Sequence, residues 1–335
     1  MKFFINNYAY PGLCKALEDR GHTVLGRHGT NSDEFNWWHH MINNKMCEPD
    51  YHQLLQDQIL EHKPDVYLCG KGWHFNRKIN PKTVKWIRDR VGATIYWSLD
   101  DPDFMGMFEQ KNMNLGYDIA LTCDGASIKR YEALGMDSYL FWPAWDEVAR
   151  DYIQVPEDKK DPEFLIVGTP YGKTKILRRD VAIAISNADI KLELWGPKDW
   201  PSMNGGHPSL RKHYKGYWKQ WNTVHHLFAK AKMNFCNHLH VSKNYLNDRV
   251  PMVLGTGGFL FLDRQPGLQD WFVDQKHVVY YDDINDLVSK AKYYRDKPEL
   301  RKEIGDNARQ LILDGHTYKH RADFLLEILA TKGIK

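Results

Sequence analysis

Residues 243–263 have the sequence KNYLNDRVPMVLGTGGFLFLD, and the fold prediction starts from this stretch. Asn247 or Asp248 can cap a short helix, because their side-chain oxygens accept hydrogen bonds from free N–H groups of a first turn. Pro251 is tolerated inside that first turn. The GTGG turn at residues 255–258 then ends the helix, and FLFLD is apolar enough for a buried strand. This order predicts one helix–strand unit of an α/β sheet.

The amino end of this predicted helix is a candidate anion site. Free N–H groups and the positive end of the helix dipole both favour an anion there. Arg249 lies in the first turn and can add a charge-assisted contact. Gly257 and Gly258 have no side chains, so their backbone can approach a ligand closely. The alternative is a purely structural helix whose arginine forms a surface ion pair.

Short apolar runs alternate with amphipathic stretches on both sides of this segment. The strands predicted in the first half are residues 2–5, 23–25, 66–69, 94–99, 119–123 and 139–142, and its helices include 51–62 and 81–90. The strands predicted in the second half are 164–168, 192–195, 233–236, 259–262 and 278–281, with helices at 175–186, 219–230, 283–295, 298–313 and 318–329. Such alternation predicts mainly parallel sheets covered by helices on both faces.

A polar segment divides the chain into two halves. Residues 146–162 contain VPEDKKDP and lack apolar periodicity, so we expect an interdomain linker there. The length of 335 residues suits two domains at about 150 residues each. We expect Rossmann-like domains at 1–145 and 163–317, with a final helix at about 318–335 packing back on the first. Ligands bind such sheets at the carboxyl ends of the strands, so two facing domains would form a cleft.

Composition limits the classes of protein but selects none. The formal net charge of +3 allows an anionic ligand or a nucleic acid without requiring either. Five cysteines form no CxxC pair, which favours a reducing compartment and no structural zinc. The apolar stretch at the amino terminus is too short for a signal peptide, and no run of about 18 apolar residues occurs. We therefore expect a cytoplasmic protein with no membrane partner.

Spaced residues of the second half resemble the carboxyl-terminal domain of GT-B glycosyltransferases, especially the CgeB-like group. Over about residues 164–326, the matching positions are Asn247, Arg249, Gly257, Leu260, Phe272, Val279, Tyr281, Asp283, Asp286, Leu287, Arg301, Ile304, Gly305, His316, Thr317, Tyr318 and Arg321. FLIVGTPYGKTK resembles the strand–turn–helix that opens this domain, and LWGP its W-G segment. The resemblance implies the α/β GT-B fold and a nucleotide-sugar donor, with a UDP-sugar favoured. It also implies no metal requirement, since helix dipoles and cations stabilise the leaving diphosphate.

One position departs from the family's pattern. The glutamate that holds the nucleotide ribose in that family falls on Met252, whose thioether accepts hydroxyl hydrogen bonds poorly. The ribose contact must then come from another residue, or the donor differs.

The predicted donor-binding residues come from this resemblance and from the turn after the strand at 164–168. That turn is flexible and carries two lysines, which suits a diphosphate, although a solvated basic turn is an equally good interpretation. His238 is expected to donate a hydrogen bond to the phosphate or the sugar. His238 and His240 have no carboxylate or cysteine at ligand spacing, so no metal site is predicted. The full predicted set is Gly168, Thr169, Lys173, Lys175, Gly196, His238, Arg249, Gly257 and Gly258.

Asp100 and Asp101 are the candidate catalytic residues. They follow a predicted buried strand, and transfer to a hydroxyl needs a base to take its proton. Two adjacent carboxylates repel, which can raise one pKa. The segment TIYWSLDDPDF resembles a stretch of T-even phage DNA β-glucosyltransferase whose aspartate is the base, and that aspartate falls on Asp101. The alternative is that both aspartates cap a turn before Pro102. The sequence does not choose between the two carboxylates.

The predicted acceptor contacts follow another strand and are Lys71, Trp73 and His74. Basic and aromatic residues interleave at 36–40 and 85–88, which suits phosphate contacts and base stacking but equally suits packing. The sharpest prediction is a glycosyltransferase whose acceptor is a hydroxymethylated pyrimidine in double-stranded phage DNA. Three alternatives remain: a transferase acting on a glycan or small molecule, a non-catalytic nucleotide-sugar or nucleic-acid-binding module, and a nucleotide-sugar epimerase.

Overall fold

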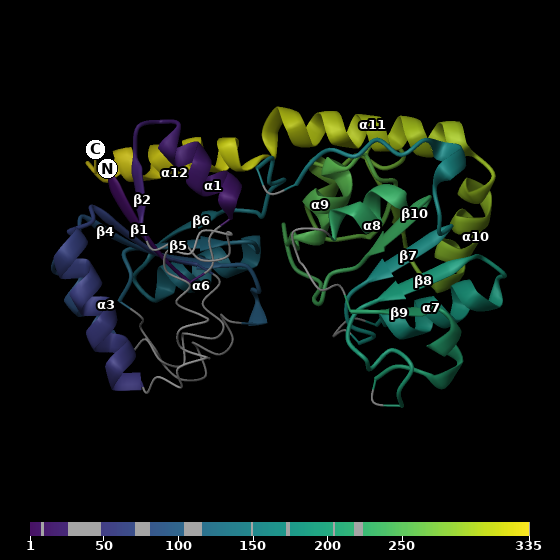
Figure 1. Ribbon diagram of the computed structural model, residues 1–335, viewed down its shortest axis with the longest axis horizontal. Coiled ribbons are helices and arrows are strands. Elements are labelled where there is room, and N and C mark those ends of the chain that lie inside the picture. The colour runs from purple at the N-terminus through teal and green to yellow at the C-terminus, as the bar shows by residue number, and fades with distance from the viewer. Residues whose placement is uncertain are drawn as a thin grey trace. The chain divides into compact units, whose positions relative to one another are not determined.

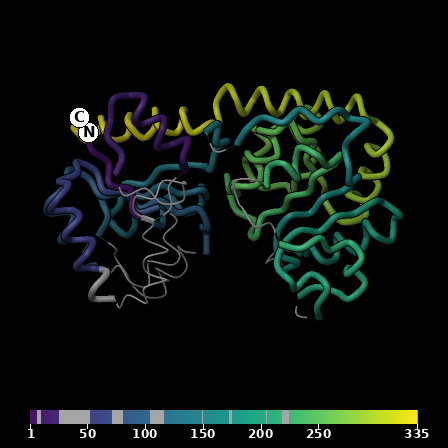
Figure 2. The backbone as a smooth tube through the Cα atoms, viewed as in Figure 1, coloured from purple at the N-terminus to yellow at the C-terminus, as the bar shows by residue number. Residues whose placement is uncertain are grey.

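The computed structural model divides the chain into two compact units, shown as a ribbon in Figure 1 and as a tube in Figure 2. The first unit is Met1–Ala149 with Thr317–Lys335, and the second is Arg150–His316. The structure describes residues 1–7, 10–25, 48–70, 81–103, 116–148, 150–171, 175–203, 205–217 and 224–334. Each unit is a parallel sheet with helices packed against it.

The first unit has a six-stranded sheet in the order β2-β1-β3-β4-β5-β6, and every neighbouring pair is parallel. Its strands are β1 Lys2–Asn7, β2 Thr23–Leu25, β3 Val66–Gly70, β4 Ala93–Ser98, β5 Ile119–Thr122 and β6 Asp137–Leu140. Its helices are α1 Pro11–Glu18, α3 Glu48–His62, α4 Pro81–Arg88, η1 Gly125–Ser127, α6 Ile128–Ala133 and α12 Tyr318–Thr331.

The second unit has a six-stranded parallel sheet in the order β12-β11-β10-β7-β8-β9. Its strands are β7 Phe164–Val167, β8 Leu192–Trp195, β9 Tyr214–Gly216, β10 Met233–Cys236, β11 Leu260–Asp263 and β12 Val279–Tyr281. Its helices are η2 Glu157–Lys159, α7 Arg178–Asn187, η3 Pro208–Lys212, α8 His225–Lys230, α9 Arg249–Gly255, η5 Leu268–Asp270, α10 Ile284–Arg295 and α11 Pro298–Gly315.

The predicted parallel α/β architecture is confirmed, with shifts at some elements. The strand predicted at 139–142 is β6 at Asp137–Leu140, because the ladder with β5 begins two residues earlier. Phe141 and Trp142 are buried beyond the strand's end, so apolar character alone placed the strand too late. The helix predicted to begin at 175 begins at Arg178. The short edge strand β9 was not predicted, because its sequence YKG is polar and has no apolar pattern.

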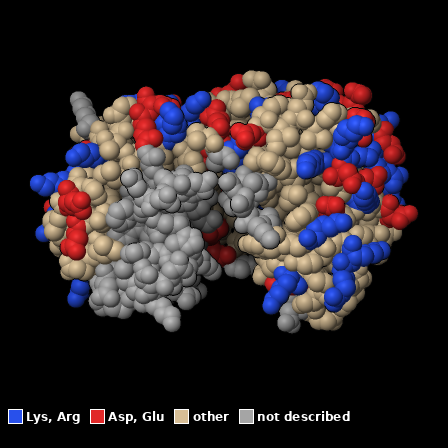
Figure 3. All heavy atoms as spheres, in the orientation of Figure 1, with Lys and Arg blue, Asp and Glu red and all other residues tan. Residues whose placement is uncertain are grey.

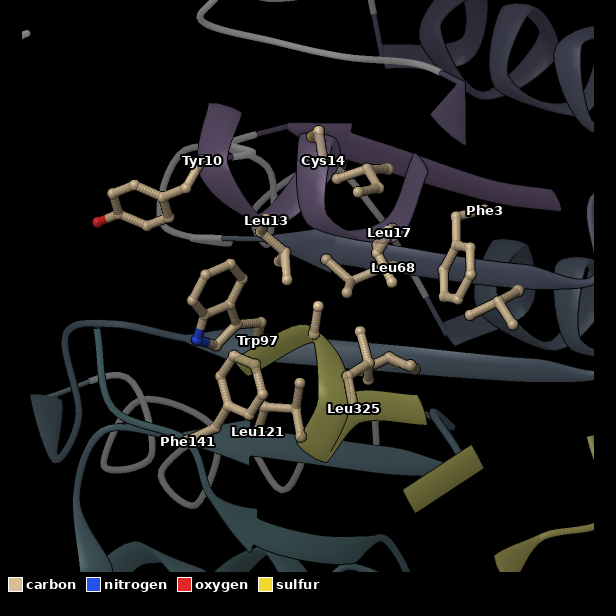
Figure 4. Close-up of a cluster of buried hydrophobic side chains, with 14 of the residues drawn as sticks. Phe3, Tyr10, Leu13, Cys14, Leu17, Leu68, Trp97, Leu121, Phe141 and Leu325 are labelled. Atoms are coloured by element: carbon tan, nitrogen blue, oxygen red, sulfur yellow. The ribbon is translucent and has the colours of Figure 1, made fainter. Parts of the chain in front are cut away.

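The core of the first unit contains residues from both ends of the chain. Figure 4 shows Trp97 of β4 beside Tyr10 and Phe141, with Leu325 of α12 in the same cluster. The ring centroid of Trp97 lies 5.6 Å from that of Tyr10 and 5.3 Å from that of Phe141. Arg321 of α12 also donates to the carbonyl of Trp142 at 2.8 Å. Burial of each large apolar side chain contributes about 1.5–3 kcal/mol, so α12 is part of this unit's stability.

In the second unit, the segment before β7 is held by a buried ion pair. Arg301 of α11 is 3% exposed, and its Nε donates to Glu157 at 2.8 Å. The same guanidinium donates to the carbonyl of Arg295 at 2.7 Å. A buried guanidinium needs such partners, because removing one leaves an uncompensated charge. Residues around Glu157 therefore fold with the second unit.

No helix within the described ranges is both long enough and apolar enough to cross a membrane.

Candidate functional site

Gly168 and Arg249 meet at the carboxyl edge of the second unit's sheet. Gly168 follows β7 and has a φ of 145°, a conformation that favours glycine. A Cβ at this position would lie 3.1 Å from Nη1 of Arg249. The guanidinium therefore lies against the backbone of the turn after β7. The structure brings these two predicted donor residues together.

Arg178, the first residue of α7, joins them and is absent from the sequence-based prediction. It is 2% exposed, and its Nη1 donates to Thr169 Oγ1 at 3.1 Å and to the carbonyl of Tyr171 at 3.2 Å. Its Nη2 donates to the carbonyl of Asn237, just beyond β10, at 3.1 Å. Burial, followed by the nearby charge of Arg249, lowers the pKa of Arg178 to about 10. This side chain thus ties the turn after β7 to the end of β10.

The two guanidiniums form a cationic pair that no directly bonded carboxylate neutralises, although the charge of Asp263 acts on Arg178 and that of Asp248 on Arg249. Among the described residues, no carboxylate forms an ion pair with Arg178 or Arg249. Two cations held close together repel, and burial strengthens that repulsion. An oxyanion with several acceptors relieves it, and guanidinium groups match phosphate geometry with two parallel hydrogen bonds. The arrangement suits a phosphate or diphosphate.

The amino end of α9 contributes through a side chain rather than through free amides. The helix has seven residues, and the backbone N–H of Arg249 donates to Asn247 Oδ1 at 3.1 Å. Asp248 forms no side-chain capping bond. Of the two residues that the sequence offered, Asp248 is the N-cap residue, but Asn247 is the one whose side chain accepts from the first N–H of the helix. Met252 is 1% exposed and packs inside the unit.

His238 lies beyond the end of β10 and pairs with Asp263 at the end of the neighbouring strand β11. Its Nδ1 lies 2.8 Å from Asp263 Oδ1, and its backbone N–H donates to the same oxygen at 3.1 Å. Gln265 Nε2 donates to Asp263 Oδ2 at 2.7 Å. Burial alone would raise the pKa of the Asp263 carboxyl, but the contacts from His238 and Gln265 hold that pKa below its ordinary value. Asp263 was not among the predicted residues.

The remaining predicted donor residues lie in different places. Gly196 follows β8 and has a φ of 158°, and a Cβ there would lie 2.0 Å from the carbonyl oxygen of Gly168, so it supports the turn by packing. Gly257 and Gly258 precede β11 and lie at the opposite, amino-terminal edge of the parallel sheet. This corrects the interpretation of the GTGG turn as a ligand contact. Lys175 is exposed, and Lys173 lies outside the described residues.

In the first unit, Asp101 follows β4 and is completely buried. Its carboxylate accepts from Thr122 Oγ1 at 2.5 Å and from the Tyr131 hydroxyl at 3.1 Å. Burial raises the pKa of Asp101 to about 6, although these hydroxyl donors oppose the shift. Asp100, one residue earlier, is partly exposed. The two carboxylates that the sequence could not separate thus have different surroundings.

Three predicted acceptor contacts, Lys71, Trp73 and His74, lie outside the described residues. Within the described ranges, no three His, Cys, Asp or Glu side chains come close enough to share a metal ion. In the part of the chain that the structure describes, Cys14, Cys69, Cys123 and Cys236 are buried and form no disulfide bond.

Asp101→Asn is expected to change how the first unit's stability depends on pH. The unfolded carboxyl ionises near 3.8 and the folded one near 6, so between these values only the folded state holds the proton. Wild type therefore loses about 3 kcal/mol of unfolding free energy as the pH rises from about 4 to 6. Asparagine does not titrate, so the variant gains stability relative to wild type across this interval. Hydrogen exchange of amides in β4 and β5 measures this difference, and a difference that stays constant with pH would contradict it.

The whole chain is similar to several solved structures. HepE of Anabaena, solved with UDP and glucose, matches with a TM-score of 0.64 at 10% identity, over 99% of this chain and 100% of that chain. Sucrose-phosphate synthase of Thermosynechococcus elongatus matches with 0.64 at 11% identity, over 99% and 98%. The DNA-modifying enzyme β-glucosyltransferase matches with 0.62 at 11% identity, over 99% and 100%. The chain has the GT-B fold.

This GT-B fold is the one predicted from the sequence. Residues 177–327 of the chain match the family model described as glycosyl transferase-like. That region begins one residue before Arg178 and includes Arg249, His238 and Asp263. No curated protein matches the chain in sequence.

Proposed function

We propose that this chain is a glycosyltransferase that moves a sugar from a UDP-sugar to a hydroxyl group. The cationic pair of Arg178 and Arg249 against the Gly168 backbone carries the proposal, because it can bind a diphosphate. When the bond between the sugar and the diphosphate breaks, the electron pair stays on the phosphate oxygen. Preorganised cations stabilise that developing charge without reorganising. The UDP bound by HepE, together with the shared GT-B fold, supports uracil as the base of the donor nucleotide.

We assign the role of base to Asp100 and a supporting role to Asp101. A base must reach the hydroxyl proton, and Asp100 is partly exposed, whereas Asp101 is fully buried. The carboxylate of Asp101 already accepts hydrogen bonds from Thr122 and Tyr131. Its contacts hold the backbone at the end of β4 and thereby fix the position of Asp100.

A thermal-shift series with UDP, GDP, CMP and TDP tests the donor. A ligand that binds only the folded state at about 1,000 times its dissociation constant adds about 4 kcal/mol of stability. UDP should therefore raise the melting temperature by several degrees, and the other nucleotides should raise it less. A melting temperature that none of the four raises would contradict the proposal.

For the acceptor, we propose a hydroxymethylated pyrimidine in double-stranded DNA. The likeness of the chain to the DNA-modifying β-glucosyltransferase supports this choice. Such a base must leave the duplex to reach an active site, at a cost of a few kcal/mol. Figure 3 shows Lys and Arg side chains on the face of the second unit in view, interspersed with Asp and Glu. Incubation with UDP-glucose and hydroxymethylated DNA should add the mass of one hexosyl residue (a hexose minus water) per modified base, and unmodified DNA should gain none.

A non-catalytic nucleotide-binding module is the second candidate, and the buried Met252 favours it. Without the glutamate that its family uses for ribose, the site has lost one donor contact. Tight UDP binding without turnover on DNA, glycans or small-molecule hydroxyls would select this candidate. Hydrolysis of UDP-glucose that does not depend on DNA would instead favour a transferase with a glycan or small-molecule acceptor.

A further inference from the structure

The His238–Asp263 pair leaves one imidazole nitrogen with no partner. His238 is completely buried, and its Nε2 has no hydrogen-bond partner among the described residues. A buried polar atom without a partner costs about 1–3 kcal/mol, so such an atom calls for an explanation. The ring is held in place from two sides, by Asp263 at 2.8 Å and by Tyr245, whose ring centroid lies 4.9 Å away. The unpartnered nitrogen is therefore fixed in direction.

Asp263 determines what this nitrogen can do. A carboxylate only accepts, so the Nδ1 that faces it carries the hydrogen. In a neutral imidazole the other nitrogen then presents a lone pair. In this tautomer Nε2 is the ring nitrogen that can accept a hydrogen bond, and it has no partner within the described residues.

The place of the pair indicates what donates that hydrogen bond. Asn237, the residue before His238, accepts from Arg178, so His238 lies directly beside the proposed phosphate site. The hydrogen-bond donors of a nucleotide-sugar that lie nearest to its diphosphate are the hydroxyls of the ribose and of the sugar. Met252 is buried and cannot accept from either. The site therefore needs another acceptor for a hydroxyl.

We propose that Nε2 of His238 accepts a hydrogen bond from a hydroxyl of the bound nucleotide-sugar, and that Asp263 is the positioning residue that directs this lone pair. The inference rests on the proposed function and names a residue that selects the donor. His238→Asn keeps a polar group near Nδ1 but removes Nε2. His238→Gln can place an amide oxygen where Nε2 was. His240→Asn is the matched control, two residues further along the same segment.

Titration calorimetry with UDP and with UDP-glucose is the first measurement. One lost hydrogen bond to an uncharged group should weaken binding by roughly two- to tenfold in His238→Asn, with partial recovery in His238→Gln. If the ribose hydroxyl is the donor, both compounds lose affinity. If the sugar hydroxyl is the donor, only UDP-glucose does. His240→Asn should bind both compounds like wild type.

Nitrogen-15 NMR of the histidine rings is the second measurement. If His238 had only a structural role, its ring nitrogen resonances would not move when the ligand binds. The Nε2 resonance of His238, assigned by its absence from His238→Asn, should move when UDP-glucose saturates the protein. In Asp263→Asn the amide can donate to Nδ1, so the tautomer should change. An unmoved Nε2 resonance, or unchanged affinities in His238→Asn, would overturn this inference alone. A wild type that binds neither compound would overturn the proposed function and this inference together.

Discussion

Arg249→Met is expected to weaken UDP binding by about a hundredfold or more. A hydrogen bond to a charged group contributes about 1.5–3 kcal/mol, and a guanidinium can form two to one phosphate. Methionine replaces the stem of the side chain but not its charge, so Arg178 would face the diphosphate alone. The unliganded variant should remain as stable as wild type, because the substitution also removes repulsion between two cations. Calorimetry with UDP and thermal melting of the unliganded protein measure the two effects separately.

The controls for this variant separate contact from charge. Arg249→Lys keeps the cation but loses the fork geometry, so its affinity should lie between those of wild type and Arg249→Met. Arg211→Met removes an exposed cation of the same unit, in η3, and should leave UDP affinity unchanged. If Arg249→Met and Arg211→Met lost the same UDP affinity, and both losses disappeared at high salt, long-range charge alone would explain the effect and the predicted contact would be contradicted.

Asp100→Asn is expected to lower turnover by about a hundred- to ten-thousandfold, which is the usual contribution of a general base. UDP affinity should not change, because Arg178 and Arg249 belong to the other unit. Release of UDP from UDP-glucose with hydroxymethylated DNA measures turnover, and calorimetry measures affinity. Asp103→Asn is a control in the same segment and should retain turnover.

Asp101→Asn tests the division of roles between the neighbouring carboxylates. The amide can still bond to the hydroxyls of Thr122 and Tyr131, so the position of Asp100 should persist. Turnover at neutral pH should then stay within about tenfold of wild type, since no reacting group is lost. An inactive Asp101→Asn with an active Asp100→Asn would reverse the assignment and make Asp101 the base.

The sequence predicted buried strands better than it predicted the residues at their ends. The bounds of β8 and β10 agree with the predicted ones. β10 is buried along its whole length, and β8 alternates buried with half-buried residues, so both give a short pattern that ends at polar residues or glycine. Gly168 and Arg249 were predicted because the resemblance and the turn chemistry both marked them. Arg178 was missed, since Leu177 before it offers no capping side chain and the helix was expected three residues earlier. It therefore looked like an ordinary residue within a helix.

Tertiary neighbours explain the other misses. Asp263 is the last residue of an apolar run, and only the pairing of β10 with β11 reveals that it faces His238. Asp100 and Asp101 are adjacent and chemically identical in the sequence. Their difference comes from Thr122 and Tyr131, which are 21 and 30 residues beyond Asp101. No local pattern reports such distant partners.

The position of α12 at the end of the chain affects the order in which the two units can fold during synthesis. It supplies Leu325, Ile328 and Leu329 to a core that is otherwise built from the first half of the chain. During translation, that core stays incomplete until residues 318–331 have left the ribosome. The second unit, continuous from Arg150 to His316, has all of its own residues earlier. We therefore expect the unit encoded second to reach its native state first, with the amino-terminal unit dependent on chaperones in the interval.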